Sequence, residues 1–207
     1  MPTVKEVLND TKKRLKEQGI DTYSLDSSLL VSEVTGLTKI QLVTHDRDEV
    51  TEEQINRLEN LVKERLKNKP MQYILGHCEF MGLDFKVTEN TLIPRGDTEN
   101  IVEEVIATIE NSGYNTVLDM CTGTGAIAIS VAHYTKAKVT ASDISSKALE
   151  VARENAKILN ADVNFIESDL FENINETFDV LVSNPPYIES EVIPTLMEQV
   201  KDYEPML

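Results

Sequence analysis

The chain has 207 residues, 41% of them hydrophobic, which is enough for one large domain or two modest ones with a buried core. No apolar run approaches the length of a membrane span and no signal segment opens the chain, so we expect a cytoplasmic protein without a membrane partner. The net charge of −16 is concentrated in residues 71–207, which hold 8 Lys and Arg against 23 Asp and Glu. A field of this sign repels nucleic-acid backbones and favours a basic protein partner or a cationic ligand.

Four short amphipathic helices are predicted in the first seventy residues. Capping residues mark their starts, and glycine or proline follows their ends. The expected starts lie at Thr3, Ser24, Thr38 and Thr51, and the expected stops at Gly19, Gly36 and Pro70. Short helices with short connections imply a small bundle, so residues 1–70 are expected to form a helical N-terminal domain.

Residues 71–93 have a different pattern and are expected to link two domains. The segment Glu79–Val87 alternates partly around Gly82, which predicts a β-hairpin.

From residue 94 to residue 207 strands and helices are predicted to alternate. The expected strands are 116–119, 138–142, 163–166 and 178–183, and the expected helices are 98–112, 126–134 and 145–159. This alternation indicates βαβ units and an α/β fold, with a parallel sheet that has helices on both faces.

The cysteines and histidines are isolated from one another. Cys78 and Cys121 lie far apart without the spacing of metal ligands, and the three histidines form no cluster with them. We therefore expect two reduced thiols and no metal site.

A glycine-rich turn, Asp119–Gly125, lies between the first strand of this domain and its helix. Its glycines let a ligand approach the backbone, and the helix N-terminus offers free N–H groups. The spacing of Gly123, Gly125 and Ala128 also fits the dinucleotide fingerprint, so a nicotinamide or flavin enzyme is an alternative. Asp119 argues against that alternative, because its carboxylate would repel a pyrophosphate but would favour the ammonium and sulfonium groups of S-adenosylmethionine.

Two further acidic residues end strands of the predicted sheet. Asp143 follows the second strand, where a carboxylate can bind ribose hydroxyls. Asp169 follows the third strand and would lie at the edge of the same crevice, near an adenine. Its alternative role is that of a helix or turn cap.

The segment Asn184-Pro185-Pro186-Tyr187 follows the last predicted strand. Consecutive prolines cannot extend a strand and instead fix a stiff, extended turn. They would hold the planar amide of Asn184 and the ring of Tyr187 rigidly at the strand end. This arrangement suits a grip on a flat, weakly nucleophilic NH2 group, such as an amide or a nucleobase amine.

Together these features resemble the bacterial release-factor glutamine methyltransferase family, also called PrmC or HemK. The matching segments are Pro70–Gly76, Phe80–Phe85, Leu92–Arg95, Asp97–Glu99, Asp119–Gly125, Asp143–Ser145, Val182–Ile188 and Tyr203–Pro205. The combination of Ile93-Pro94-Arg95 with the Asn-Pro-Pro-Tyr segment is characteristic of protein-glutamine methyltransferases.

The resemblance implies a Rossmann-like, class I methyltransferase domain that follows a small helical domain and a linking hairpin. It implies methyl transfer from S-adenosylmethionine to the amide nitrogen, N5, of the glutamine in the Gly-Gly-Gln motif of peptide chain release factors. Release factors would be the partners, bound with help from the helical domain, and no nucleic acid would bind directly. The enzyme would act in translation termination.

The expected site residues follow from these motifs. Those expected to bind the cofactor are Asp119, Cys121, Thr122, Gly123, Thr124, Gly125, Asp143, Asp169, Leu170 and Asn184. Those expected to bind the substrate are Asn184, Pro185, Pro186 and Tyr187, and of these Asn184, Pro185 and Tyr187 are also expected to be catalytic. Because no strong base is evident, we expect positioning and electrostatics to dominate the catalysis.

The chain departs from the family pattern at three places. Cys121 stands where the family often has a glycine, so we expect a negative φ or spare room there. Gly96 and Asp97 replace a common Pro-Glu pair. The family continues beyond the Glu-Pro at residues 204–205, so we expect a truncated chain that lacks the last strands of the sheet.

Four other functions remain open at this point. A sister enzyme methylates a glutamine of a ribosomal protein and has nearly the same motifs. Amino-methylating DNA enzymes hold a flipped base with a similar Asn-Pro-Pro-Tyr segment, although the acidic charge argues against DNA. A truncated chain could bind S-adenosylmethionine or a partner without turnover. A nicotinamide oxidoreductase is the alternative that the sequence favours least.

Overall fold

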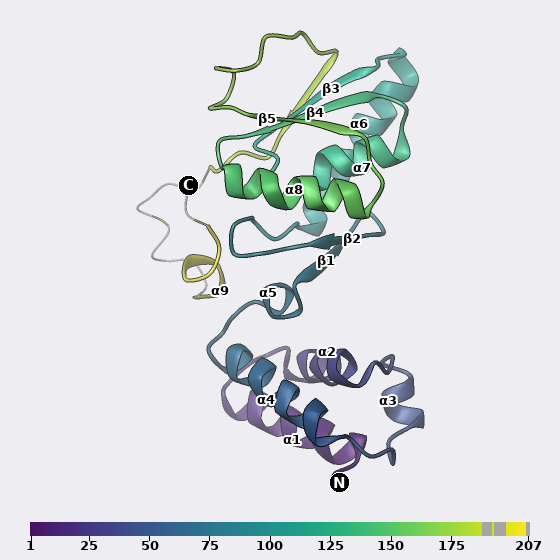
Figure 1. Ribbon diagram of the computed structural model, residues 1–207, viewed down its shortest axis with the longest axis vertical. Coiled ribbons are helices and arrows are strands. Elements are labelled where there is room, and N and C mark those ends of the chain that lie inside the picture. The colour runs from purple at the N-terminus through teal and green to yellow at the C-terminus, as the bar shows by residue number, and fades with distance from the viewer. Residues whose placement is uncertain (188–191, 193–197, 206–207) are drawn as a thin grey trace. The chain divides into compact units, whose positions relative to one another are not determined.

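The computed structural model describes residues 1–187, 192 and 198–205 (Figure 1). The chain divides into two compact units, Met1–Leu75 and Gly76–Leu207. Each unit has its own cluster of buried hydrophobic residues. Within the described residues, no helix combines the length and the apolar character that crossing a membrane requires.

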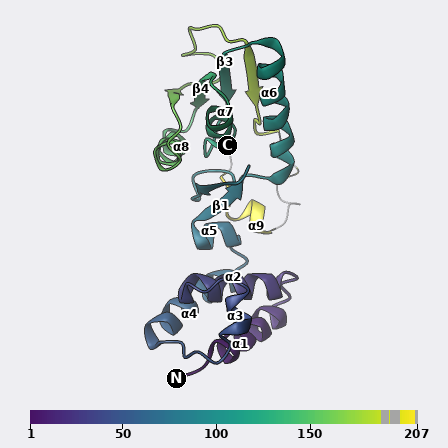
Figure 2. The same ribbon diagram turned by 90° about the vertical axis from the view of Figure 1, so that its right-hand side faces the viewer.

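The first unit is a small helical bundle, as the sequence predicts. Its helices are α1 (Val4–Glu17), α2 (Tyr23–Thr35), α3 (Gln41–Thr44), α4 (Glu52–Leu66) and α5 (Met71–Leu75). Helices α1, α2 and α4 pack against one another (Figure 2) and bury Leu15, Leu30 and Val62 between them. Helix α5 has no counterpart in the sequence prediction, and it packs on α2 and α4.

The predicted caps at Thr3 and Thr51 are confirmed, whereas α3 begins at Gln41, three residues after the predicted start at Thr38. Thr3 and Glu6 bond reciprocally at the start of α1, and Thr51 does the same with the glutamine three residues later at the start of α4. The predicted cap at Ser24 is wrong, because α2 already begins at Tyr23.

A buried ion pair explains the different start of α2. The carboxylate of Asp26 turns inward and accepts a hydrogen bond from Arg65 Nε at 2.7 Å. Thr22, which precedes the helix, donates its hydroxyl to the same carboxylate at 2.8 Å instead of capping a backbone N–H. A buried carboxylate needs hydrogen-bond donors. The Thr22 hydroxyl therefore bonds to Asp26 and does not cap the helix.

The second unit begins with a hairpin of β1 (His77–Phe80) and β2 (Leu83–Lys86). Both turn residues, Met81 and Gly82, have positive φ, as in the primed turns that suit two-residue hairpins. The rings of Phe80 and Phe85 meet edge to face and belong to the core of this unit. Tyr134 donates its hydroxyl to the Met81 carbonyl at 2.6 Å, so the hairpin is anchored at its turn.

A four-stranded parallel sheet organises the rest of the second unit. Its strands are β3 (Thr116–Met120), β4 (Lys138–Asp143), β5 (Val163–Glu167) and β6 (Val180–Ser183), in the order β5-β4-β3-β6. The helical elements are η1 (Gly96–Thr98), α6 (Glu99–Ser112), α7 (Ala126–Tyr134), α8 (Ser146–Ile158) and α9 (Glu198–Lys201). This confirms the Rossmann-like α/β arrangement.

The strand order creates a switch point beside β3. The chain steps from β3 to β4 and β5 on one side of the sheet, then returns to β6 on the other side of β3. Open α/β sheets bind their ligands at the carboxyl ends of the strands at such a point.

The prediction of helices on both faces is wrong for the described residues. Helices α6, α7 and α8 pack side by side in a row (Figure 1). The connection from β5 to β6, residues 168–179, forms turns rather than a helix. Its polar turn-forming residues, Asp169, Asn173 and Asn175 among them, favour turns over a helix.

Candidate functional site

The glycine-rich turn and the Asn-Pro-Pro-Tyr segment leave the sheet at neighbouring positions. In the register of β3 and β6, Met120 lies opposite Ser183. The Ser183 hydroxyl donates to the Met120 carbonyl at 2.7 Å and ties the two strand ends together. Cys121 directly follows β3 and Asn184 directly follows β6. These two residues therefore lie side by side at the switch point.

Asp119 lies beneath the glycine-rich turn and is fully buried. One carboxylate oxygen accepts hydrogen bonds from the Thr122 hydroxyl at 2.6 Å and from the Ala128 N–H at 3.1 Å. The other oxygen has no partner among the described residues. Burial raises the pKa of Asp119 to about 7, against an ordinary value of 3.8.

Asp143 holds the turn from the neighbouring strand. One of its carboxylate oxygens accepts from the Gly123 N–H and the other from the Ser145 N–H, each at 2.9 Å. The Thr122 N–H donates to the Ser142 carbonyl at 3.0 Å, which adds a second bond from β4. Binding of ribose hydroxyls by Asp143 stays a prediction, and its observed contacts are to the backbone.

The two glycines of the turn have different surroundings. Gly123 has a φ of 57°, and a Cβ added there would meet nothing within 4 Å. Gly125 has a φ of 80°, and its Cβ would come within 2.8 Å of Ile129 and 3.2 Å of Ala152. Open space at the first glycine suits the approach of a ligand, whereas the second permits close packing of α7 and α8.

Cys121 adopts a backbone conformation that favours glycine. Its φ is 62°, so the first of the two expected alternatives, a negative φ, is wrong, and spare room at this position stays a prediction. A left-handed non-glycine residue costs about 1–2 kcal/mol. Its half-buried thiol has a raised pKa, chiefly because burial disfavours the thiolate.

A polar hollow lies at the ends of β4 and β5. It has a volume of about 380 Å³ and is lined by Ile144, Glu167, Ser168, Asp169, Glu172 and Asn173. Asp169 is exposed in the hollow, and Leu170, the next residue, is exposed and has a φ of 46°. Ser168 fixes this turn, because its hydroxyl donates to the Leu170 carbonyl and accepts from the Asn173 N–H.

The Asn-Pro-Pro-Tyr segment is largely accessible. Asn184 is half-buried, both prolines are exposed and Tyr187 is 79% exposed. Ile188, the last residue of this resembling segment, lies outside the described residues. The amide and the ring are thus available to a substrate at the edge of the sheet.

Two other segments of the sequence resemblance meet in the second unit. The guanidinium of Arg95, from the Ile-Pro-Arg segment, pairs with the buried carboxylate of Glu204. The pKa of Glu204 is raised mainly by burial, although Arg95 counteracts this effect.

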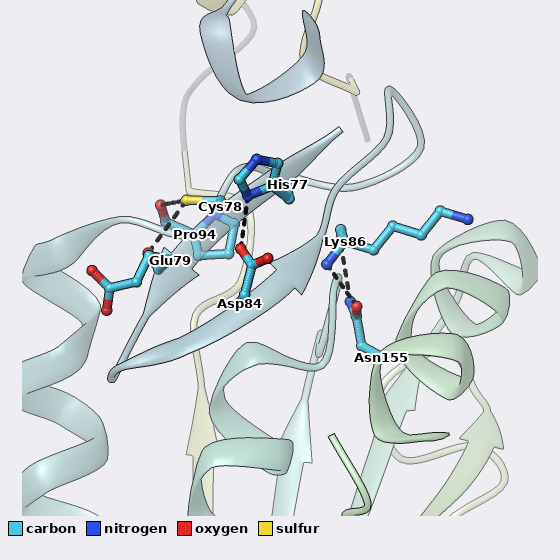
Figure 3. A network of polar contacts seen from close by, with 7 residues as sticks. All are labelled: His77, Cys78, Glu79, Asp84, Lys86, Pro94 and Asn155. Atoms are coloured by element: carbon cyan, nitrogen blue, oxygen red, sulfur yellow. Dashed lines mark hydrogen bonds and ion pairs between the residues drawn. The ribbon is translucent and has the colours of Figure 1, made fainter. Parts of the chain in front are cut away.

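One residue of the site has no place in the sequence prediction. Asn155 on α8 is fully buried and donates a hydrogen bond to the Thr124 carbonyl of the glycine-rich turn at 3.0 Å. Figure 3 shows its amide also facing the backbone of Lys86 in the hairpin. A sequence signal does exist, because Asn155 is a polar residue on the same helical face as Ala148 and Ala152, which are buried.

The residues present fit S-adenosylmethionine better than a dinucleotide. The carboxylates of Glu167, Asp169 and Glu172 around the hollow favour a cationic ligand and oppose a pyrophosphate. Open space at Gly123 admits the ligand to the backbone. Among the described residues, no cluster of His, Cys, Asp or Glu has the geometry of a metal site.

Comparisons with known proteins agree with this chemistry. A family model for the PrmC N-terminal domain matches residues 6–76, and one for the methyltransferase small domain matches residues 101–200. The release factor glutamine methyltransferase of Clostridium acetobutylicum is 42% identical over 99% of this chain and 74% of its own length. Its counterpart in Fusobacterium nucleatum is 44% identical over 97% of this chain and 58% of its own length.

A solved structure was also matched. It is the Pyrococcus abyssi tRNA (uracil-54, C5)-methyltransferase with S-adenosyl-L-homocysteine, at 24% identity and a TM-score of 0.46 over 57% of this chain and 30% of that one. We draw no conclusion from a likeness at that score. The relatives, by contrast, cover nearly the whole chain, and the two family models match most of each unit. The chain belongs to the release factor glutamine methyltransferase family, a family of S-adenosylmethionine-dependent enzymes that methylate glutamine.

Proposed function

We propose that this protein methylates the side-chain nitrogen, N5, of the glutamine in the Gly-Gly-Gln motif of peptide chain release factors. The observation that carries the proposal is the pairing of β3 with β6, through which the glycine-rich turn and Asn184 leave the sheet side by side. The names of the relatives support release factors as the substrate. We propose in addition that the helical unit Met1–Leu75 helps to bind the release factor and that the enzyme works in the cytoplasm.

The difficulty of the reaction lies in the amide nitrogen, whose lone pair is delocalised into the carbonyl. S-adenosylmethionine, when bound, supplies the methyl group and a good leaving group at sulfur. In our proposal the Asn184 side-chain oxygen and the Pro185 carbonyl accept hydrogen bonds from the NH2 group of the substrate. These bonds orient the nitrogen and stabilise positive charge that develops on it, and the nitrogen releases one proton to water once it carries the methyl group.

Tyr187 has a role that its exposure supports. Its ring is 79% exposed in the free protein, which leaves it free to pack on the amide plane of the substrate. We propose that this packing orders the glutamine side chain before the reaction. The cofactor in turn would contact the turn Cys121–Gly125, Asp119 and Asp143, with its adenine toward Asp169 and Leu170.

An Asn184→Ala variant tests the proposed mechanism. Loss of one preorganised hydrogen-bonding group at a reacting centre costs about 10²–10³ in turnover. We expect that loss in a methyl-transfer assay with labelled S-adenosylmethionine and a purified release factor, while the melting temperature changes little. Asn111→Ala, at an exposed position near the end of α6, is the matched control and should transfer methyl groups normally. Undiminished transfer by Asn184→Ala would refute the mechanism.

The same assay separates the alternative substrates. Release factor, ribosomal protein and DNA are offered in parallel, and a release factor whose Gly-Gly-Gln glutamine is replaced serves as the negative control. Methylation that persists on this replaced substrate, or that is faster on ribosomal protein or DNA, would refute the proposed specificity. Cofactor binding without transfer to any of the three would indicate a non-catalytic module.

A further inference from the structure

Asn155 joins three parts of the second unit through one side chain. Its Oδ1 accepts a hydrogen bond from the Lys86 N–H at 2.8 Å, and its Nδ2 donates to the Lys86 carbonyl at 3.0 Å (Figure 3). The same Nδ2 donates to the Thr124 carbonyl at 3.0 Å. Helix α8, strand β2 and the glycine-rich turn therefore meet at a single fully buried amide.

The chemistry of this contact is specific to asparagine. The amide pairs with both backbone groups of Lys86, as a neighbouring strand would, and it covers this point on the edge of β2. Two carbonyls and one N–H face the side chain, so both donors and the acceptor of the amide are used. An aspartate has the same shape but offers no donor to either carbonyl when it is ionised.

The packing beside Asn155 makes the turn sensitive to it. Ala152, one turn earlier on α8, lies close to position 125 of the turn. A Cβ at that position would come within 3.2 Å of the Ala152 Cβ, so a glycine is needed there. Thr124 immediately precedes that glycine and is itself buried. Helix α8 thus controls the turn twice, by contact at Gly125 and by the hydrogen bond at Thr124.

The other bonds to the turn come from the strands of the sheet. Asp119 on β3 binds Thr122, and Asp143 on β4 binds Gly123. Asn155 instead connects the turn to a hairpin that has its own anchors, since the Met81 N–H donates to the Glu99 carboxylate at 2.7 Å. Among the hydrogen bonds of the described residues, those of the Asn155 amide thus link the turn to β2.

We propose that Asn155 is a positioning residue, which holds the glycine-rich turn in its cofactor-binding conformation and couples cofactor binding to the order of the β1–β2 hairpin. This inference rests on the binding of S-adenosylmethionine at the turn, which is part of the proposed function. Linkage requires the effect to be reciprocal, so that an ordered hairpin favours cofactor binding and the bound cofactor orders the hairpin.

The first experiment measures cofactor affinity by calorimetry. Asn155→Ala and Asn155→Asp each remove the donor to Thr124, and we expect each to weaken S-adenosylmethionine binding about ten-fold or more. Val102→Ala removes buried packing in α6 and controls for lost stability, because its apolar side chain forms none of the hydrogen bonds that join Asn155 to the turn and to Lys86. Glu154→Gln breaks the exposed ion pair with the Lys86 ammonium and controls for the contact between α8 and β2.

A second experiment needs no substitution. Hydrogen exchange of the unmodified protein is followed with and without S-adenosylmethionine, and we expect the cofactor to slow exchange of the Lys86 amide about five-fold or more. In the Glu154→Gln protein this protection should persist. In Asn155→Asp it should be lost even where the cofactor is saturating.

The outcomes separate this inference from the proposed function. Affinity that falls in the Asn155 variants no further than in Val102→Ala at equal loss of melting temperature would overturn the positioning role. Protection of the turn without protection at Lys86 would overturn the coupling. If the unmodified protein does not bind S-adenosylmethionine at all, the proposed function fails and this inference fails with it.

Discussion

The glycine-rich turn and the Asn-Pro-Pro-Tyr segment lie side by side but are held in different ways. Residues 122–125 form hydrogen bonds to β3, β4 and α8, and the carboxylates and the amide that hold them are buried. The Asn-Pro-Pro-Tyr segment has one described polar tie, from Ser183 just before it, and its prolines are exposed. Its stiffness comes from its own rings, which fix the backbone without help from neighbours.

The difference teaches where substitutions should act. A turn that is held by its neighbours can be disturbed from a distance, through any residue that supports it. A segment stiffened by its own covalent structure responds mainly to changes within it. Stability and cofactor binding should therefore be sensitive around the turn, whereas turnover alone should be sensitive at the prolines.

Gly125→Ala should have the largest effect on stability. The new Cβ would lie 3.2 Å from that of Ala152, which cannot rotate away, and the backbone would keep a φ of 80°. Overpacking and the left-handed backbone together predict a loss of about 3 kcal/mol in the free energy of unfolding. Urea denaturation measures this value.

Gly123→Ala is the matched control for that substitution. It also has a positive φ, but its Cβ would meet nothing within 4 Å, so a loss of only about 1 kcal/mol is expected. Because its Cβ would fill the open space, it should weaken cofactor binding more than its small stability loss explains. Equal stability losses in the two variants would contradict the proposed packing role of α8.

Asp119→Asn should remove a pH dependence of stability. The pKa of Asp119 is raised from 3.8 to about 7 by burial. Between these values the folded protein holds a proton that the unfolded chain has lost, so stability falls as pH rises toward 7. Between pH 5 and pH 7 the titration of Asp119 should lower the free energy of unfolding by about 2 kcal/mol.

Denaturation at a series of pH values measures this change. The asparagine in Asp119→Asn cannot ionise. The free energy of unfolding of this variant should therefore fall less between pH 5 and pH 7 than that of the wild type, because all other groups contribute equally to both proteins. Asp179 is a useful contrast, because hydrogen bonds from Asn115 and Thr116 lower its pKa and its stabilising contribution is lost only in acid. Parallel pH profiles of wild type and Asp119→Asn would show that the carboxyl is not protonated in this range.

Local signals in the sequence predicted most of the fold. Caps at Thr3, Thr51 and Ser145, glycines after helices and alternating strand patterns act within a few residues, and the structure has these features. The two motifs of the site were predictable for the same reason. Their juxtaposition followed from a general rule, because carboxyl ends of parallel strands meet at one edge.

Contacts between distant residues limited the rest of the prediction. The start of α2 depends on a buried pair between Asp26 and Arg65, which are 39 positions apart. Asn155 meets Lys86 across 69 positions, so its role has no local signature beyond a polar residue on an apolar face. The positive φ of Cys121 likewise goes against the preference of the residue itself, so the residue type does not predict it.

Pro186→Ala should have the smallest effect and tests the other half of the comparison. Replacing proline restores backbone freedom worth about 1 kcal/mol, which the segment must lose again when it orders the substrate. Turnover should therefore fall about five-fold and the free energy of unfolding by no more than about 1 kcal/mol, while cofactor affinity stays near its original value. Pro2→Ala, at an exposed proline in the helical unit, should leave turnover unchanged. Pro186→Ala could instead weaken cofactor binding as strongly as Gly123→Ala does. That result would show that the segment and the turn depend on each other, and it would contradict the view that the prolines alone stiffen the segment.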